Sequence, residues 1–519
     1  ARRLLDEFGF GGLQISGIFE RFVRGGDYLP CGVDAVKPLA TTAAFLGDIH
    51  KASMDILGVP AIMGGDQEGG MSSSIFRRRN VSIMPHQMGI GASNDADLAY
   101  RCAKVTAREM RLLGLDMLYG PSLDVNTNPN NPEIGPRSFG DDPEACARFG
   151  EAVIRAYREE NVISTAKHFP GRGHGQSNAH AELEVIDVDR ARLDAVELLP
   201  FRRAIAAGVD SIMLAHTLFP AVEPDRVPAS LSKRIVTDLL RGELGFDGLV
   251  IPDTLTMFAI SKNFEVPRAA AMCLEAGADM IFMKVTELYG PCIEAIKDSV
   301  KAGRLTEERI DDSVRRILTL KRDRGLFERT TPTPEEVDRV VGCDEHAATA
   351  REAARRAIVT IKNEGGTLPL KRNTTPSVLC VIPRDMNVVM ANDPTLSHDM
   401  LQRHLAHRLP DVQTVLVDER PNTPQHFEAV GRSKNVDAVI FGIYSGGMSQ
   451  EQETLLKEIV SLGKPVIVVI GASPYVANRV PAEVKAIVCG FSVGPYVMEA
   501  LAGVLTGGME AGGTMPVSL

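Results

Sequence analysis

The segment from Lys167 to His180 contains the side-chain types that a catalytic site needs. It reads Lys-His-Phe-Pro-Gly-Arg-Gly-His-Gly-Gln-Ser-Asn-Ala-His, with five ionisable side chains among three glycines and a proline. The apolar-leaning run 162–166 precedes it, so a strand that ends near Lys167 would present Lys167 and His168 at its tip. Glycine lets a loop approach a ligand closely, and functional residues often lie on loops held by a rigid scaffold. The segment therefore predicts a binding or catalytic loop.

His180 is the candidate proton carrier of this loop, and Asn178 stands two residues before it. A histidine with a hydrogen-bonding neighbour can donate and accept protons near neutral pH. A solvated loop histidine is the alternative interpretation.

Two aspartates are placed where a carboxylate could act on a ligand. Asp253 directly follows the apolar run 249–252, so it could be a nucleophile, a base or a metal ligand, or it could cap a helix. Asp66 is flanked by four glycines and could bind ligand hydroxyls or serve as a turn residue.

For two further polar residues, a structural role is as well supported by the sequence as a role in ligand binding. Arg137 could bind a polar ligand through its forked guanidinium, or it could pair with Asp141 or Asp142 on the surface. His216 follows a strand-like run, where a histidine is as often a hydrogen-bonded structural group as a ligand contact.

The histidine spacing argues against a catalytic metal. Positions 168, 174 and 180 are six residues apart, and no second histidine follows at the i+4 spacing of a helical metal motif. We therefore predict no metal site.

The first part of the chain alternates strand-like and helix-like patterns, which is typical of a parallel sheet built from βα units. A charged or titratable residue follows nearly every apolar run, as expected where the loops of a (β/α)8 barrel converge on one face. We predict such a barrel over residues 1–328. The apolar runs are 12–16, 60–65, 117–123, 162–166, 211–215, 249–252 and 280–283, and the amphipathic segments are 97–113, 143–160, 193–207 and 232–244.

A second α/β pattern follows a polar, proline-bearing segment. We assign residues 329–344 to a linker and 345–519 to a smaller α/β sandwich of flavodoxin-like type. No Gly-x-Gly-x-x-Gly follows its first strand, so a dinucleotide cofactor is not indicated. After a helix near 345–357, its expected strands are 377–383, 413–418, 438–444, 465–471 and 486–491.

The overall charge narrows the range of partners. The 519-residue chain has a net charge of −10, which disfavours nucleic acid and anionic membranes as partners. No apolar run is long enough for a membrane span. Eight scattered cysteines without a C-x-x-C motif favour reduced thiols, so we expect a cytoplasmic protein.

Four motifs in order resemble glycoside hydrolase family 3, and within it the β-N-acetylglucosaminidase branch. The motifs are Asp-Gln-Glu-Gly-Gly at 66–70, Asn-Pro-Glu-Ile-Gly-Pro-Arg-Ser-Phe at 131–139, Lys-His-Phe-Pro-Gly-x-Gly from 167 with a histidine seven residues after its last glycine, and Asp-x-Leu-x-Met at 253–257. The resemblance extends into the second domain, through Lys362-Asn363-Glu364 and Leu368-Pro369-Leu370.

The resemblance implies a retaining exo-β-N-acetylglucosaminidase that acts on a small carbohydrate and needs no cofactor. It makes Asp253 the nucleophile and His180 the acid/base, with Asn178 beside it. A histidine in the acid role departs from the usual carboxylate pair, but its pKa suits both duties. The residues that the resemblance assigns to the sugar are Asp66, Arg137, Lys167 and His168, with help from His216.

Several positions depart from the pattern of the branch, which usually has Asp at 178, His at 172 and Asp at 174. Its arginine after the Gly-Gly pair is also replaced, by the segment 71–74. Asn178 can accept a hydrogen bond from the catalytic histidine but adds no charge. The alternatives are therefore a phosphorylase or transglycosylase on the same sugar, or a weakened carbohydrate-binding relative.

Overall fold

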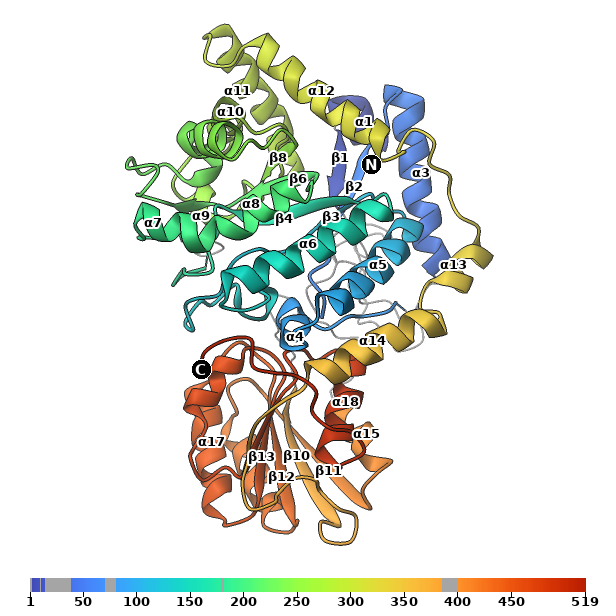
Figure 1. Cartoon of the computed structure of the whole chain (residues 1–519), viewed down its shortest axis with the longest axis vertical. Helices are drawn as coiled ribbons and strands as arrows, with labels where there is room; N and C mark the ends of the chain where they lie inside the picture. Colours follow the sequence, from blue (N-terminus) through green and yellow to red (C-terminus); the bar gives the residue numbers. More distant parts are fainter. Residues whose placement is uncertain (1, 10, 15–38, 71–80, 179–181, 385–399) are drawn as a thin grey trace.

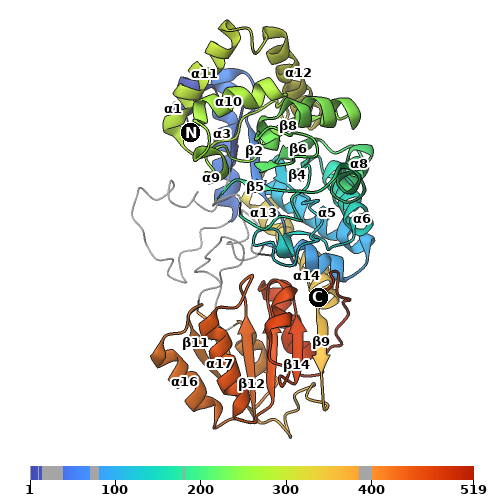
Figure 2. The same ribbon diagram turned by 90° about the vertical axis from the view of Figure 1, so that its left-hand side faces the viewer.

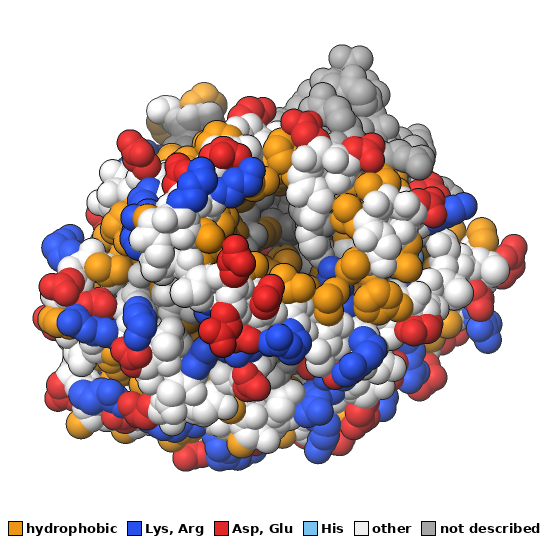
Figure 3. Space-filling view, turned by 90° about the horizontal axis from the view of Figure 1, so that it is seen from above, with side chains coloured by type: hydrophobic (Ala, Val, Ile, Leu, Met, Phe, Trp, Pro, Cys, Tyr) orange, Lys and Arg blue, Asp and Glu red, His pale blue; other side chains and the backbone are white. Residues whose placement is uncertain are grey.

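The computed structural model describes residues 2–9, 11–14, 39–70, 81–178, 182–384 and 400–519. Two domains lie one above the other along the longest axis of the molecule, and helices α4 (Gln87–Ala92) and α14 (Asp344–Ala357) lie where they meet (Figure 1). Seen from the first-domain end, the surface is hollowed near its centre, and side chains of both charge signs surround the hollow (Figure 3).

The first domain contains a parallel sheet with the strand order β1-β2-β3-β4-β6-β8. No strand is assigned to the expected run at 280–283, although the N–H groups of Asp279 and Met280 donate to Val250 O, 2.8 and 3.4 Å away. This run therefore begins beside β8. The strands are β1 (Gly12–Gln14), β2 (Ile62–Asp66), β3 (Met117–Tyr119), β4 (Ile163–Phe169), β6 (Ser211–Leu214) and β8 (Leu249–Pro252).

Local signals set the ends of the helices that cover this sheet. The Asp95 carboxylate caps α5 (Ala96–Leu113) by accepting two backbone N–H bonds, and Gly114 ends it with φ 106°. The others are α1 (Arg2–Phe8), α3 (Leu39–Leu57), α6 (Pro143–Glu159), α7 (Arg190–Arg192), α8 (Leu199–Ala206), α9 (Phe258–Ser261), α10 (Val266–Ala276), α11 (Tyr289–Lys301), α12 (Glu307–Asp323) and α13 (Pro334–Val340), with π-helical segments at Leu193–Glu197 and Arg234–Glu243.

The second domain is a sheet between two layers of helices (Figure 1), and Figure 2 shows its strands side by side. Val378 and Cys380 of β10 pack into one core, and Leu379 and Val381 pack into the other. Burial on both faces explains its near-continuous apolar strands. The strand order is β11 (Asp411–Val417), β10 (Ser377–Pro383), β12 (Ala438–Ile443), β13 (Val466–Ile470), β14 (Ala486–Cys489) and β9 (Val359–Asn363), and the helices are α15 (Met400–Ala406), α16 (Thr423–Ser433), α17 (Gln450–Ser461) and α18 (Pro495–Leu505).

The predicted α/β class, with a barrel-type domain followed by an α/β sandwich, is confirmed. Strand β9 was not predicted, and it pairs antiparallel with β14 at the edge of the second sheet. Helix α13 lies within the segment predicted as a linker, and the exact domain boundaries stay a prediction. Among the helices that the structure describes, none has the length and hydropathy needed to cross a bilayer.

Candidate active site

The tips of β2 and β4 bring the predicted residues Asp66 and Lys167 together. Lys167 Nζ lies 2.9 Å from Asp66 Oδ1 and 2.5 Å from Glu68 Oε1. The Lys167 side chain is buried, and burial alone would lower its pKa. The charges of Glu68 and Asp66 outweigh burial and raise the pKa of Lys167, so the amine remains a cation.

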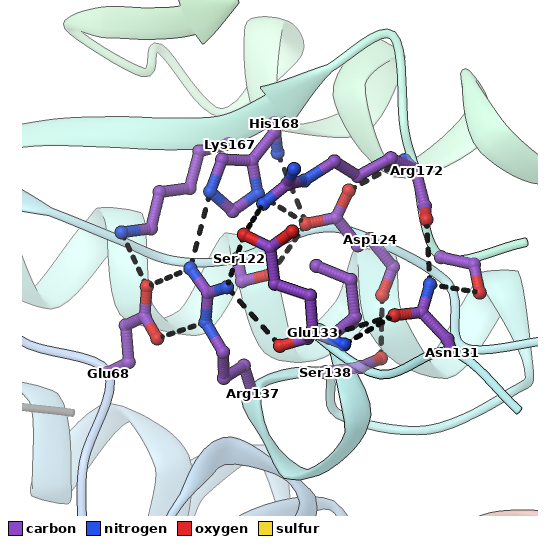
Figure 4. Close-up of polar contacts among 12 residues, drawn as sticks. Glu68, Ser122, Asp124, Asn131, Glu133, Arg137, Ser138, Lys167, His168 and Arg172 are labelled. Carbon is purple, nitrogen blue, oxygen red and sulfur yellow. Dashed lines mark hydrogen bonds and ion pairs between the residues drawn. The ribbon is translucent and has the colours of Figure 1, made fainter. Parts of the chain in front are cut away.

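Arg137 joins the same cluster through a two-pronged ion pair (Figure 4). Its Nε and Nη2 donate to the two carboxylate oxygens of Glu68 at 2.6 and 2.8 Å. Although burial would raise the pKa of Glu68, the charges of Arg137 and Lys167 hold it far below its ordinary value. The alternative in which Arg137 pairs with Asp141 or Asp142 is wrong. Asp142 instead caps α6, and Asp141 accepts the N–H of Ser518.

The hydrogen bonds of His168 define its tautomer. Nδ1 lies 2.7 Å from Asp124 Oδ2, and Nε2 lies 3.3 Å from Arg137 Nη2. A guanidinium can only donate, so Nε2 accepts and Nδ1 carries the proton that it donates to Asp124. Burial, and next the charge of Arg172, lowers the pKa of His168, which agrees with a neutral ring.

Asp253 lies directly after β8, in the loop that follows the strand. Its N–H donates to Leu214 O at 3.0 Å, and its Oδ1 accepts the Thr254 N–H at 2.7 Å. The helix-cap alternative for Asp253 is wrong, because α9 begins at Phe258 and its N-cap residue is Met257.

Nearby charges keep the Asp253 carboxyl ionised. Burial would raise its pKa, but His168, His216 and Arg172 lower it to about 2. An ionised carboxylate can act as a nucleophile or a base, but it cannot donate a proton.

His216 supports the segment that contains Asp253. Its Nε2 lies 3.1 Å from Thr254 O, and its Nδ1 lies 2.8 Å from Ser230 Oγ. A carbonyl only accepts, so Nε2 carries the proton and Nδ1 accepts the Ser230 hydroxyl. Both ring nitrogens thus bind within the protein, and any effect of His216 on the sugar would pass through Asp253 and Thr254.

A second buried ion pair lies beside His168. Glu133 pairs with Arg172 Nη2, and its Oε1 lies 3.7 Å from Arg137 Nη1 (Figure 4). The Arg172 N–H also donates to Asp124 Oδ1 at 2.8 Å. Arginine at position 172 is thus matched by a buried carboxylate.

Sequence reasoning assigned no specific site role to four buried charged residues of this cluster, although Asp124 is among the charged residues that follow the apolar runs. Two of them carried a readable signal. Glu68 is inside the Asp-Gln-Glu-Gly-Gly motif, and Asp124 directly follows the apolar run 117–123. The other two, Glu133 and Arg172, are 39 positions apart, and no local pattern shows that they pair.

The loop that contains Asn178 is held at its base. Asn178 is half-buried, and its carbonyl accepts the Glu182 N–H at 3.0 Å. Glu184 Oε1 accepts the Ser177 N–H at 2.8 Å, and a Cβ on Gly175 would lie 2.2 Å from that oxygen. Glu184 belongs to β5 (Glu184–Val185), which pairs with β7 (Thr217–Leu218). The predicted acid/base His180 lies outside the described residues.

The structure offers no metal centre in the parts of the chain that it describes, where no group of three His, Cys, Asp or Glu side chains could hold an ion. His174 Nδ1 instead lies 3.0 Å from Thr127 Oγ1 and 3.1 Å from Arg192 Nη2.

Comparison with known protein families identifies the family to which this chain belongs. The sequence pattern of the glycosyl hydrolase family 3 N terminal domain matches residues 14–320, and that of the glycosyl hydrolase family 3 C-terminal domain matches residues 358–519. The chain belongs to glycosyl hydrolase family 3. The resemblance predicted from the four motifs is therefore confirmed.

Relatives in this family are named for related activities. The chain is 33% identical over 332 residues to a beta-N-acetylglucosaminidase/beta-glucosidase of Cellulomonas fimi, which covers 62% of this chain and 58% of that relative. It is 28% identical over 505 residues to beta-hexosaminidase A of Pseudoalteromonas piscicida, covering 89% of this chain and 83% of that relative. A solved family 3 beta-N-acetylglucosaminidase from Paenibacillus sp. str. FPU-7 superposes with TM-score 0.89 at 34% identity, covering 100% of this chain and 94% of that one.

Proposed function

We propose that this family 3 chain is a retaining exo-β-N-acetylglucosaminidase that releases terminal β-linked N-acetylglucosamine. One observation carries the proposal: Asp253 presents an ionised carboxylate after β8, near His168, His216 and Arg172. The names of the relatives from C. fimi, P. piscicida and Paenibacillus support the substrate class.

The ionisation of Asp253 supports the nucleophile role over the acid role. In the proposed first step, a carboxylate oxygen of Asp253 attacks the anomeric carbon while the leaving oxygen takes a proton, which gives a glycosyl-enzyme and the free aglycone. Water then attacks the same carbon and restores Asp253. Two inversions return the β configuration. We propose His180, assisted by Asn178, as the proton donor of the first step and the base of the second.

The paired charges support roles for the remaining residues in holding the sugar. Asp66 has 42% of its side chain exposed, whereas Glu68 has 2%. We therefore propose that Asp66 binds sugar hydroxyls, while Glu68 holds Arg137 and Lys167 in place as donors. His168 completes this set, and His216 positions the Asp253 segment.

The test is an assay with an aryl β-N-acetylglucosaminide, with and without inorganic phosphate, followed by NMR of the first-formed sugar. Release of phenol together with β-N-acetylglucosamine is the expected result. Formation of a sugar 1-phosphate when phosphate is present would replace hydrolysis with phosphorolysis. Absence of phenol release under both conditions would contradict an enzymatic role and favour a carbohydrate-binding relative.

We expect Asn178→Asp to raise kcat by about tenfold or more. An aspartate there would stabilise the protonated catalytic histidine, and loss of the analogous charge in a serine protease triad costs about 10⁴ in turnover. The added charge should also raise the pKa of that histidine and move the alkaline limb of the pH–rate profile upward. The measurement is kcat against pH, with the exposed Asn130→Asp as the matched control. Equal rates in the two variants would contradict the prediction.

A further inference from the structure

His86 connects the second domain to the first. It is fully buried, and its Nδ1 lies 2.9 Å from the carbonyl oxygen of Phe491, which follows β14. A carbonyl only accepts, so Nδ1 carries a proton and donates it across the domain boundary. Burial lowers the pKa of His86 to about 4, so the ring is neutral near neutral pH.

The two glycines of the Asp-Gln-Glu-Gly-Gly motif lie against the segment 85–86, Gly70 against the ring of His86 and Gly69 against the backbone. A Cβ on Gly70 would lie 2.4 Å from His86 Cε1, and a Cβ on Gly69 would lie 2.1 Å from Pro85 O. The Gly70 N–H donates to Met84 O at 2.7 Å. These glycines therefore let the backbone after Glu68 rest on the segment that contains His86.

Glu68 connects the glycine pair to the proposed sugar-binding residues. It directly precedes Gly69, and its carboxylate pairs with Arg137 at 2.6 and 2.8 Å and with Lys167 at 2.5 Å. A shift of the glycine pair would move Glu68 and so displace both cations.

A second contact between the domains reaches the other side of the site. Asn126 Nδ2 donates to Tyr475 Oη at 3.1 Å, and the same hydroxyl donates to Asn126 O at 3.1 Å. Asn126 is two residues from Asp124, the acceptor of the His168 Nδ1 proton. Both contacts thus connect the second domain to residues that hold proposed sugar-binding groups.

We propose that the second domain positions the sugar-binding residues of the first, with His86 as the main positioning residue and Tyr475 as a second one. The inference rests on the proposed function only where the test measures kinetics. The backbone order of residues 66–70 can be measured without turnover.

The experiment uses three variants of the full chain. His86→Phe keeps a ring against Gly70 but removes the donor to Phe491 O, and His86→Asn keeps a donor near the Nδ1 position. Tyr475→Phe removes only a hydroxyl and is expected to fold. The control is Glu352→Gln, which weakens the ion pair between Arg101 of α5 and Glu352 of α14, at 2.7 and 2.9 Å.

Two readouts separate positioning from general stability. We expect His86→Phe to raise KM for the aryl β-N-acetylglucosaminide about fivefold or more with kcat within about twofold, as for lost uniform binding. His86→Asn should recover part of that loss, and Tyr475→Phe should raise KM by about two- to threefold. Hydrogen exchange at residues 66–70 should be faster in His86→Phe than in the control.

The outcomes distinguish the positioning role of the second domain from the proposed enzymatic function. Unchanged exchange at 66–70 in His86→Phe, or an unchanged KM in both His86→Phe and Tyr475→Phe, would overturn the positioning role. Faster exchange in a chain that has no turnover even as wild type would support the positioning role and contradict the proposed function.

Discussion

Asp253→Ala is expected to lower kcat by about 10⁴-fold or more, because loss of a nucleophile removes the covalent route. The surroundings keep this carboxylate ionised, with a pKa of about 2, so it is available as a nucleophile over the whole working pH range. The measurement is steady-state and burst kinetics with the aryl β-N-acetylglucosaminide. Asp253→Asn tests the same role with little change in volume, because its amide oxygen can still accept the Thr254 N–H.

Azide distinguishes a nucleophile from a residue that only supports the fold. In Asp253→Ala, azide could attack the anomeric carbon from the vacated side, and a single inversion would give an α-glycosyl azide. The matched control is Asp187→Ala at an exposed aspartate, which should retain full activity. An Asp253→Ala enzyme with near wild-type kcat, or an azide product of β configuration, would contradict the nucleophile role.

Glu68→Gln is expected to lower the free energy of unfolding by about 3–5 kcal/mol, because it leaves Arg137 and Lys167 buried without their shared carboxylate. The side chain keeps its shape, so the loss comes from charge and not from a cavity. Sugar binding should weaken in parallel, since both cations lose their anchor. Denaturant unfolding at pH 7 measures the first effect, and KM measures the second.

The pH dependence of unfolding gives an independent check of the role of Glu68. The pKa of Glu68 in the folded protein is far below its ordinary 4.5, so its ionisation stabilises the fold above that pH, and this stability is lost as the pH falls. Glu68→Gln should therefore reduce the acid sensitivity of unfolding. The control is Glu294→Gln, which breaks an exposed pair with Lys297 and should cost at most about 1 kcal/mol. A Glu68→Gln protein as stable as this control would contradict the prediction.

The sequence by itself determined the parallel strands of the two large sheets and most of the charged residues at or near their ends. Apolar runs followed by amphipathic segments predict parallel βα units, because the residue period of each element is local. The same runs predict Asp66, Lys167 and Asp253 at or just after strand ends. In the structure Asp66 ends β2 and Asp253 follows β8, whereas β4 continues two residues beyond Lys167. Strands β5 and β7 escaped prediction, because two residues in each are too few to show a period.

Only the tertiary structure decided which charges meet. Arg137 and Glu68 are 69 positions apart, and His86 and Phe491 are 405 apart. Any of several carboxylates could have paired with Arg137, because an ion pair depends on distance in space and on shared burial, and neither has a local pattern. For the same reason, no local pattern shows that the glycines at 69 and 70 allow a close approach to His86 and Pro85.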